Sequence, residues 1–303
     1  MKYWLLIILV FFVVECNAEI TDYSEMVELL ENSKEDSIKY EQLKTEIITR
    51  FPASEKTFEL ANEEFYDKVY PIWRNDSLKV EVIFELIKKY PQTNWRRTMY
   101  QYLTYSLENL KRTDELLQVL EDFRTSFPDD YKPYSQSARY LNKNDIELKK
   151  AIEFAQRAHK MSYDYPKLDF YPEKEWNLEK RSAPVNTAAI LSDILIKLER
   201  FKEAEEILKK TIGNNQLGVD DETTLGHCYY FLAKAYQGLN KRKNAVDAAI
   251  QSLIAGDSRN FYTPQADSLL RRIIGYKDLS EDEYIDFMRY RSKYDDVIFT
   301  DVT

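Results

Sequence analysis

Four aromatic–proline dipeptides divide the first half of the chain at an almost fixed interval. They are Phe51-Pro52, Tyr90-Pro91, Phe127-Pro128 and Tyr165-Pro166, and their prolines are 39, 37 and 38 residues apart. A period of this length is typical of stacked helical hairpins, because each hairpin is one repeating unit that ends on the same residue types. This spacing points to a repeat scaffold before any functional residue is considered.

Residue usage predicts helix along most of the chain. Its 303 residues include only six glycines, none before Gly213, and apolar side chains recur at spacings of three and four. Both features favour helices that each bury one stripe. Without glycine, we expect the early hairpin turns to use Asn, Asp, Ser and Pro. The first paired helices are expected at 21–32 and 37–50, 54–70 and 77–90, and 95–109 and 113–127, with Asp76 or Ser77 as the N-cap of the fourth.

The N-terminus has the features of an export signal. Lys2 precedes an unbroken apolar run from Tyr3 to Val14, and Cys16-Asn17-Ala18 places small residues at a cleavage site. We therefore predict a signal peptide over 1–18, a mature chain that starts at Glu19, and an exported protein, periplasmic or secreted.

Two alternatives to a cleaved signal stay open. An uncleaved anchor is disfavoured, because twelve residues of helix reach roughly 18 Å, short of a ~30 Å hydrocarbon core. Lipid attachment at Cys16 is disfavoured because the charged Glu15 stands where lipoprotein signals have a small residue. No other stretch is apolar enough to cross a membrane, so we expect no membrane span after signal removal.

Charge and cysteine usage restrict the partners and the stabilising chemistry. The formal net charge is -9, which argues against nucleic acid as a partner because phosphate binding needs clustered Lys and Arg. After signal removal Cys228 is the one remaining cysteine. The mature chain is therefore expected to have no internal disulfide and to hold Cys228 as a buried, slowly reacting thiol.

Small and bulky residues recur in a way that is similar to the tetratricopeptide repeat, a 34-residue helix–turn–helix. The segment from Tyr229 to Gly256 carries the clearest match, and "AAILSDILIKLERFKEAEEILKKTI" and "AIEFAQRAHKM" carry others. The matching positions are Tyr229, Leu232, Ala233, Tyr236, Ala245 and Ala249 in the first, Ala188, Leu191, Ser192, Leu195, Ala204 and Leu208 in the second, and Ala151, Ala155 and Ala158 in the third.

The resemblance covers roughly 24–257 and implies a fold. That fold is all-α, a right-handed α-solenoid of about six helical hairpins over 19–278, followed by a capping helix and a short β-prone tail over 279–303. Repeat lengths of 37–53 residues imply insertions between the hairpins. In the family, ligands lie against the inner face of each first helix. The matching positions here are Thr98, Gln101, Tyr105 and Glu108; Asn186, Ala189, Asp193 and Lys197; and His227, Tyr230, Lys234 and Gln237.

Catalytic and metal-binding motifs do not emerge from the sequence. His159 and His227 have no metal-ligand spacing, and no Gly-rich phosphate loop, G-x-S-x-G or C-x-x-C is present. Acidic pairs such as Asp220-Asp221 are expected by chance in a chain with 52 acidic residues. We therefore predict a non-enzymatic protein with no catalytic, metal or cofactor site.

Two segments depart from the repeat pattern. Residues 164–182, "DYPKLDFYPEKEWNLEKRS", are rich in aromatics and predict an ordered loop or a short helix over 172–179, either as a packing loop or as a lid over the concave face. Beyond a capping helix over 264–274 and a helix over 280–294, the phrase Phe299-Thr300-Asp301-Val302-Thr303 is similar to the opening strand of FG-GAP/UnbV-type β-propeller domains. A frayed tail is the alternative.

These features favour an exported, tetratricopeptide-like protein-binding scaffold or adaptor. Its partner is expected to be a protein or peptide, including a C-terminal domain of the same longer protein. The alternative is a carbohydrate-binding or envelope-assembly component, because 23 tyrosines supply aromatic side chains that stack on sugars.

Overall fold

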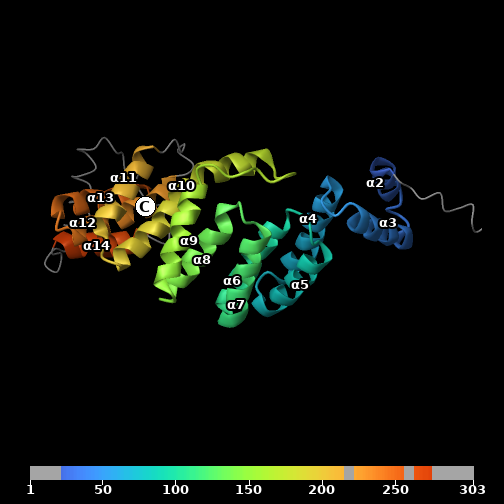
Figure 1. Ribbon diagram of the computed structural model, residues 1–303, viewed down its shortest axis with the longest axis horizontal. Coiled ribbons are helices and arrows are strands. Elements are labelled where there is room, and N and C mark those ends of the chain that lie inside the picture. Colours follow the sequence, from blue (N-terminus) through green and yellow to red (C-terminus); the bar gives the residue numbers. More distant parts are fainter. Residues whose placement is uncertain (1–21, 215–221, 256–262, 275–303) are drawn as a thin grey trace, which may run out of the picture. The chain divides into compact units, whose positions relative to one another are not determined.

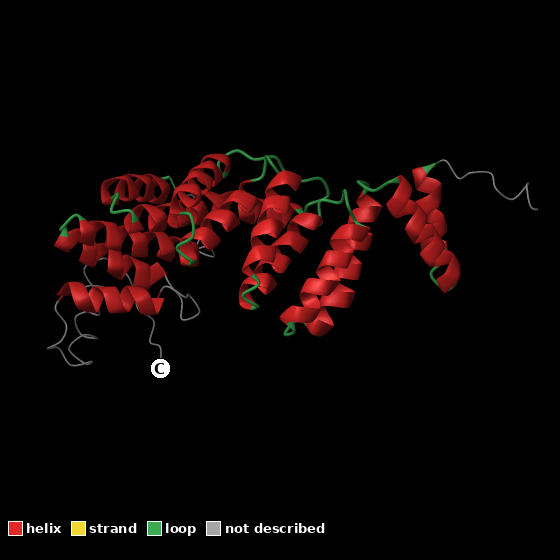
Figure 2. Cartoon of the chain, turned by 60° about the horizontal axis from the view of Figure 1, so that its bottom comes forward, coloured by secondary structure: helices red, strands yellow, loops and turns green. Residues whose placement is uncertain are grey.

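Helices alone make up the secondary structure of the part of the chain that the computed structural model describes, residues 22–214, 222–255 and 263–274. Thirteen α-helices and one short 3₁₀ turn follow one another there, and Figure 2 shows no strand among them. They form six hairpins, α2–α3 to α12–α13, and a final single helix, α14. The predicted all-α repeat of about six hairpins is confirmed.

The chain divides into two compact units, which are described separately. Unit 1 comprises the residues up to Thr125 together with Leu168–Tyr171, and unit 2 comprises Ser126–Lys167 and the residues from Pro172 onward. The helices of unit 1 are α2 (Tyr23–Asn32), α3 (Ser37–Arg50), α4 (Glu55–Val69), α5 (Asp76–Lys89), α6 (Arg96–Asn109) and α7 (Thr113–Ser126, whose last residue falls in unit 2), with the 3₁₀ turn η1 (Tyr70–Ile72) after α4.

Unit 2 contains the remaining three hairpins and the final helix (Figure 1). Its helices are α8 (Tyr131–Lys143), α9 (Leu148–Met161), α10 (Glu173–Lys197), α11 (Phe201–Gly213), α12 (Glu222–Gly238), α13 (Arg242–Ala255) and α14 (Thr263–Ile274). The first helices of successive hairpins pack in sequence, with α8 against α10, α10 against α12 and α12 against α14. This row gives neighbouring hairpins a shared face.

One turn recurs in the last four hairpins and does not use glycine. Its central residue is Lys111, Asp145, Glu199 or Asn240, each with φ between 54° and 57°. The next residue in each turn donates a backbone N–H to a carbonyl five positions back, as Arg112 does to Leu107 over 3.0 Å. This pattern satisfies orphan carbonyls at a helix end. Our expectation of Asn, Asp, Ser and Pro in the early turns is wrong at Lys111 and Glu199, where the closing hydrogen bonds offset the cost of a left-handed conformation.

The ends of the early helices follow the predicted boundaries to within two residues. The carboxylate of Asp36 caps α3 by accepting from the Lys39 N–H at 3.1 Å. In α5 the cap is the Asn75 side chain, which accepts from the Leu78 N–H at 3.1 Å. The prediction of Asp76 or Ser77 as this cap is therefore wrong, by one or two residues.

Small residues lie where the helices of unit 2 cross. Alanines at the positions matched to the repeat are fully buried, and the matched leucines are buried beside them, whereas Tyr229 is half-buried. Ala233 is buried while the adjacent Lys234 is partly exposed, as the predicted register requires. Because alanine lets two backbones approach closely, these positions set the helix-to-helix spacing.

The insertion over 164–182 is resolved into two parts. Residues 168–171 belong to unit 1, where the Phe170 ring lies 6.2 Å from that of Phe58. The predicted short helix over 172–179 begins close to the predicted position, but it is wrong in extent, because α10 runs without interruption from Glu173 through Pro184 to Lys197. Proline removes one helical hydrogen bond, and burial of Trp176, Ala183 and Val185 on the same helix offsets that loss.

Several predictions fall outside the described residues. They concern the signal peptide over 1–18, the helix over 280–294 and the strand-like tail. The predicted capping helix over 264–274 is present as α14. Among the described residues, no helix combines the length and the apolar character that crossing a membrane requires.

Candidate functional site

The predicted site residues of unit 2 include a connected group around Asp193. The carboxylate of Asp193 on α10 accepts a hydrogen bond from the Asn142 side chain on α8 at 2.6 Å. Its other oxygen lies 3.5 Å from the ammonium of Lys234 on α12. One carboxylate thus joins the first helices of three consecutive hairpins.

Two more predicted residues complete this group. Lys197 donates to the backbone carbonyl of Asn142 at 2.5 Å and to the carboxylate of Asp145 at 2.9 Å. The ammonium of Lys234 also lies 5.6 Å from the ring centre of Tyr230. We refer to Asn142, Asp193, Lys197, Tyr230 and Lys234 as the Asp193 cluster.

Within the cluster, burial and charge act on the phenol of Tyr230. Burial raises the pKa of Tyr230, and the negative charge of Asp193 raises it further. The phenol is therefore a neutral hydrogen-bonding group. Asp193 and Lys234 retain 25% and 30% of their side-chain exposure, so both remain accessible beside their ion pair. The cluster offers donors and acceptors at one place, without a strong excess of either charge.

Asn142 was missed by the sequence analysis, although the turns could have revealed it. In the turn described above, the backbone carbonyl that accepts the N–H from five residues later belongs to Leu107 in the third hairpin. In the fourth hairpin it belongs to Leu141, 34 residues further along the chain. The same shift takes Glu108, a predicted site residue, to Asn142. The equivalents of Thr98, Gln101 and Tyr105 are then Lys132, Ser135 and Arg139. The first helix of the fourth hairpin therefore carries matching positions, from Lys132 to Asn142, that the prediction left out.

The other predicted residues of unit 2 differ in their burial. Asn186 and Gln237 are exposed, His227 is half-buried, and Ala189 is buried. The predicted face is thus brought together around α8, α10 and α12 at Asp193, while its outlying members lie elsewhere on the same helices.

In unit 1 one predicted residue, Tyr105, belongs to an exposed aromatic surface whose other members were not predicted. Thr98, Gln101 and Glu108 on α6 are half-buried, whereas Tyr105 is 49% exposed. Tyr66 and Trp73 are 53% and 44% exposed, and the Trp73 ring lies 5.1 Å from that of Tyr102. We call Tyr66, Trp73, Tyr102 and Tyr105 the aromatic surface. Single tyrosines are unremarkable in a sequence, so the packing of α4 and α6 with Trp73, the residue that follows η1, was needed to show that they gather.

Catalytic and metal chemistry find little support in the described ranges. No group of three or more His, Cys, Asp and Glu side chains there could hold a metal ion. His159 lies 3.1 Å from the Thr187 hydroxyl, and burial together with the charge of Lys210 lowers its pKa to about 4. Cys228 is a buried free thiol, as predicted, and burial raises its pKa to about 12. Both are packed side chains, neutral at pH 7.

Comparison with known proteins identifies a fold and no family. No protein-family model matches the chain, and no curated protein matches it. The structure is similar to a chain in the crystal structure of the APC/C hetero-tetramer Cut9–Hcn1, with a TM-score of 0.52 and 14% sequence identity. The match covers 84% of this chain and 42% of that chain. That neighbour contains tetratricopeptide repeats, so the present fold is a tetratricopeptide-like helical repeat.

Proposed function

We propose that this protein is an exported, non-enzymatic scaffold that binds an extended polypeptide along the first helices of unit 2. Such repeats are typically interaction scaffolds. The observation that carries the proposal is the Asp193 cluster, in which Asp193 and Lys197 of α10 and Lys234 of α12 are partly exposed beside the buried Asn142 of α8. A peptide backbone presents alternating N–H and C=O groups, which a row of mixed donors and acceptors can pair.

Unused hydrogen-bonding capacity supports the same location. The carboxamide oxygen of Asn142 is buried and accepts no hydrogen bond. An unpaired buried acceptor costs stability, so the hydrogen-bonding capacity at this place is not filled within the chain. In the proposal this row lies on the concave side of the repeat, and the partner is a separate protein or a C-terminal domain of the same longer protein. The structural neighbour is itself seen in an assembly with a second protein.

The binding experiment uses charge reversal at the cluster. The full chain is used to capture proteins from the periplasmic or secreted fraction, and captured proteins are tested again with Asp193→Lys and Lys234→Glu. We expect each single variant to lose the specific partner, because each leaves two like charges at the centre of the row. The matched control is Glu203→Lys on α11, where Glu203 pairs with Arg200 on an exposed surface. Capture that is unchanged in both cluster variants would contradict the proposal.

Export is tested separately from binding. Mass spectrometry of the exported protein is expected to show a mature chain that begins at Glu19 and carries one unmodified thiol. A lipid-modified Cys16 at the N-terminus would place the scaffold on a membrane surface, and a full-length product that begins at Met1 and stays in the cytoplasm would remove the proposal of export.

A further inference from the structure

The connection between α9 and α10 changes unit twice within a few residues. Residues up to Lys167 and from Pro172 onward belong to unit 2, whereas Leu168–Tyr171 belong to unit 1. These four residues therefore lie in a unit to which neither of their neighbours along the chain belongs. We call them the 168–171 turn. The contacts that hold the turn show what kind of surface it lies on.

Both ends of this excursion are fastened in unit 2. The ring of Tyr165 lies 4.8 Å from that of Trp176, and both side chains are buried. The Tyr165 hydroxyl donates to the carboxylate of Glu179 at 3.4 Å, and Lys132 pairs with the same carboxylate at 2.9 Å. Residues 166–175 therefore form a loop that is closed at its base within unit 2 and carries the turn near its tip.

The turn has a defined and strained shape. The Tyr171 N–H donates to the Leu168 carbonyl at 3.2 Å, which closes a four-residue β-turn. Phe170, the third residue of the turn, has a φ of 61°, a left-handed conformation that is unfavourable for a bulky side chain. Backbone strain of this kind persists where surrounding contacts hold it. Contacts between the turn and the rest of unit 1 supply that support.

One side chain of the turn contacts buried aromatic rings of unit 1. The Phe170 ring lies 6.2 Å from that of Phe58 on α4, and the Phe58 ring lies 5.6 Å from that of Trp95. Phe58 and Trp95 are buried, whereas Phe170 is 41% exposed. A ring that keeps this much contact with water gains only part of the free energy of full burial. The Phe170 contact can therefore open without taking the core beneath it apart.

The rest of the turn contacts the beginning of α6. Arg97 is 2% exposed, and its guanidinium lies 5.8 Å from the centre of the Tyr171 ring, where a cation is attracted to the aromatic face. The side-chain amide of Asn94 donates a long hydrogen bond, of 3.5 Å, to the backbone carbonyl of Asp169. Unit 1 thus contacts two adjacent aromatic side chains and the backbone carbonyl that precedes them.

We propose that unit 1 contains a binding site for a tight turn with two adjacent aromatic side chains, and that Leu168–Tyr171 occupy it as an exchangeable internal ligand. The partner class follows from the occupant, because a protein loop that presents the same groups in the same shape can replace it. Leaving the site relieves the left-handed backbone of Phe170, which favours exchange. The site shares no residue with the Asp193 cluster, so the inference does not depend on the proposed polypeptide binding there.

Tethering determines how strongly the internal ligand competes. Both ends of the loop are attached to the same chain, so the turn is present at its site at an effective concentration of about a millimolar. A free peptide with the sequence of the turn has to displace it. Removing the two rings of the internal ligand from the full chain should therefore raise the apparent affinity for the free peptide.

The test measures binding of a fluorescent peptide of residues 168–173, cyclised to hold the turn, to the full chain by anisotropy. The parent is compared with the double variant Phe170→Ser, Tyr171→Ser. We expect the peptide to bind the double variant at least about tenfold more tightly than the parent, and a peptide with the same two changes to bind neither. Equal binding by both chains, or no binding to the double variant at millimolar peptide, would overturn the proposal.

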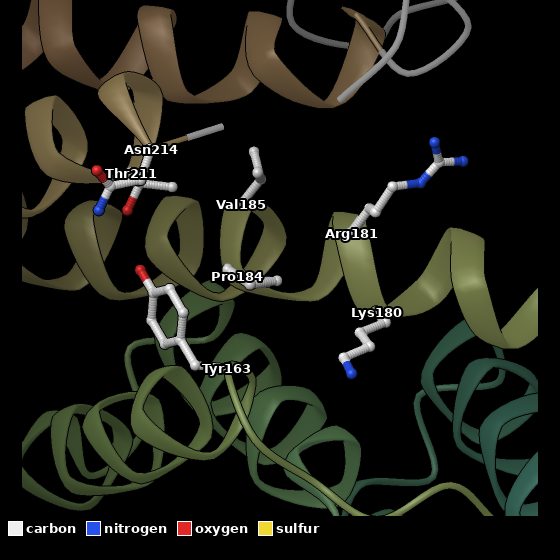
Figure 3. A pocket seen from close by; sticks show the side chains of 7 residues that line it. All are labelled: Tyr163, Lys180, Arg181, Pro184, Val185, Thr211 and Asn214. Atoms are coloured by element: carbon white, nitrogen blue, oxygen red, sulfur yellow. The ribbon is translucent and has the colours of Figure 1, made fainter. Parts of the chain in front are cut away.

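The matched control is Tyr163→Ser, at an aromatic residue of the same connection that lies outside the turn. Tyr163 is 46% exposed, close to the 41% of Phe170. Its side chain lines a pocket of about 210 Å³ in unit 2, where Figure 3 shows it reaching toward Thr211 and Asn214. Because this side chain is directed into unit 2, we expect the control to bind the peptide as the parent does. A gain equal to that of the double variant would assign the effect to a loosened connection and refute the internal ligand.

A second measurement uses the parent chain and needs no variant. Trypsin can cleave after Lys167, directly before the turn. Excess cyclic peptide is expected to raise the rate of this cleavage several-fold, because displacement of the turn frees the bond. Cleavage after the exposed Lys111, between α6 and α7, should not change. An unchanged rate at Lys167, at a peptide concentration that saturates the double variant, would show that the turn does not exchange.

Discussion

Units 1 and 2 build the same type of helical hairpin with different side chains at the helix crossings. Among the described residues, unit 2 buries fourteen alanines, while Ala61 is the single buried alanine of unit 1. Unit 1 instead fills its crossings with large side chains, such as Phe65, Phe123 and Tyr90. Helical hairpins can therefore pack in two ways. In unit 2 alanines let the helix backbones approach closely, and in unit 1 large side chains fill the space between the helices. The two solutions should respond oppositely to changes in side-chain volume.

The two units also differ in what their first helices expose. Unit 1 presents the aromatic surface, in which burial and the neighbouring Tyr66 and Tyr105 raise the pKa of Tyr102. Unit 2 presents the ion pair and amide of the Asp193 cluster. Exposed aromatic groups on a repeat scaffold mark surfaces suited to recognition. The difference shows that a common fold leaves the chemistry of its faces free to diverge.

Removing volume from unit 1 is expected to have the largest effect. Phe65→Ala should lower the free energy of unfolding by about 3–5 kcal/mol, because the Phe65 ring is buried against Trp95 and Tyr102. Urea unfolding followed by tryptophan fluorescence measures this loss. Tyr66→Ala, a change at an exposed ring on the same helix, should cost less than about 1 kcal/mol. Equal costs for the two variants would show that the crossing is not filled as described.

Adding volume to unit 2 is the opposite test. Ala233→Trp should cost about 1–3 kcal/mol or more, since Ala233 is fully buried on α12 and leaves no space for a larger side chain. Lys234→Ala, one residue further on, should change stability by no more than about 0.5 kcal/mol. Thermal unfolding of both variants is the measurement. A melting temperature for Ala233→Trp that equals that of the parent would refute the assigned register.

The buried carboxylate of Glu64 stabilises unit 1 at neutral pH, and this stabilisation is lost in acid. Burial raises the pKa of Glu64, but the bonds from Lys89, Tyr90, Lys68 and Lys44 outweigh it, so the pKa lies well below its usual range. Because the folded pKa is lower than the unfolded value near 4.5, this stability is present above that value and is lost as pH falls below it. At pH 7 Glu64→Gln should cost about 2 kcal/mol.

The pH dependence of this variant supplies its own control. Urea midpoints measured between pH 7 and pH 3 should fall less steeply for Glu64→Gln than for the parent. Glu115→Gln, which removes an exposed partner of Arg112, should retain the slope of the parent. Identical slopes for the parent and Glu64→Gln would contradict the role given to this carboxylate.

In unit 2 the buried His159 makes the free energy of unfolding depend on pH over a higher range than Glu64 does in unit 1. Burial and the charge of Lys210 lower the pKa of His159 from 6.5 to about 4. The unfolded chain therefore takes up a proton first as pH falls, so stability declines from about pH 6.5 toward pH 4 by about 1–3 kcal/mol. His159→Gln should remove this decline. Urea midpoints at pH 7 and pH 5 check it, and a decline that persists in the variant would assign it to other groups.

Local sequence pattern was sufficient for the helices and for much of the packing register. Helix boundaries for α2 to α7 and the buried alanines of α9, α11 and α13 could be predicted, because a helix places residues three and four apart on one face. The sequence pattern gave the wrong answer where tertiary packing outweighed a local backbone preference. The helix predicted over 172–179 continues as α10 through Pro184 to Lys197, and Lys111 and Glu199 adopt a left-handed backbone that glycine or asparagine usually occupies.

The candidate site was only partly accessible from sequence. Asp193, Lys197, Tyr230 and Lys234 were found because the repeat register places them on first helices. Asn142 was not, since the fourth hairpin lacked an assigned first helix until its turn was seen to repeat.

The sequence by itself determined a glycine-poor chain of helical hairpins, the stripe that each helix buries, and the alanines that set the crossings of unit 2. These are consequences of side-chain volume and helical period, which act over a few residues. Tertiary structure alone decided which polar groups meet. Asn142 reaches Asp193 across 51 residues of sequence, and such a pair forms only once the crossings have fixed the spacing between α8 and α10, because a hydrogen bond tolerates a few tenths of an ångström.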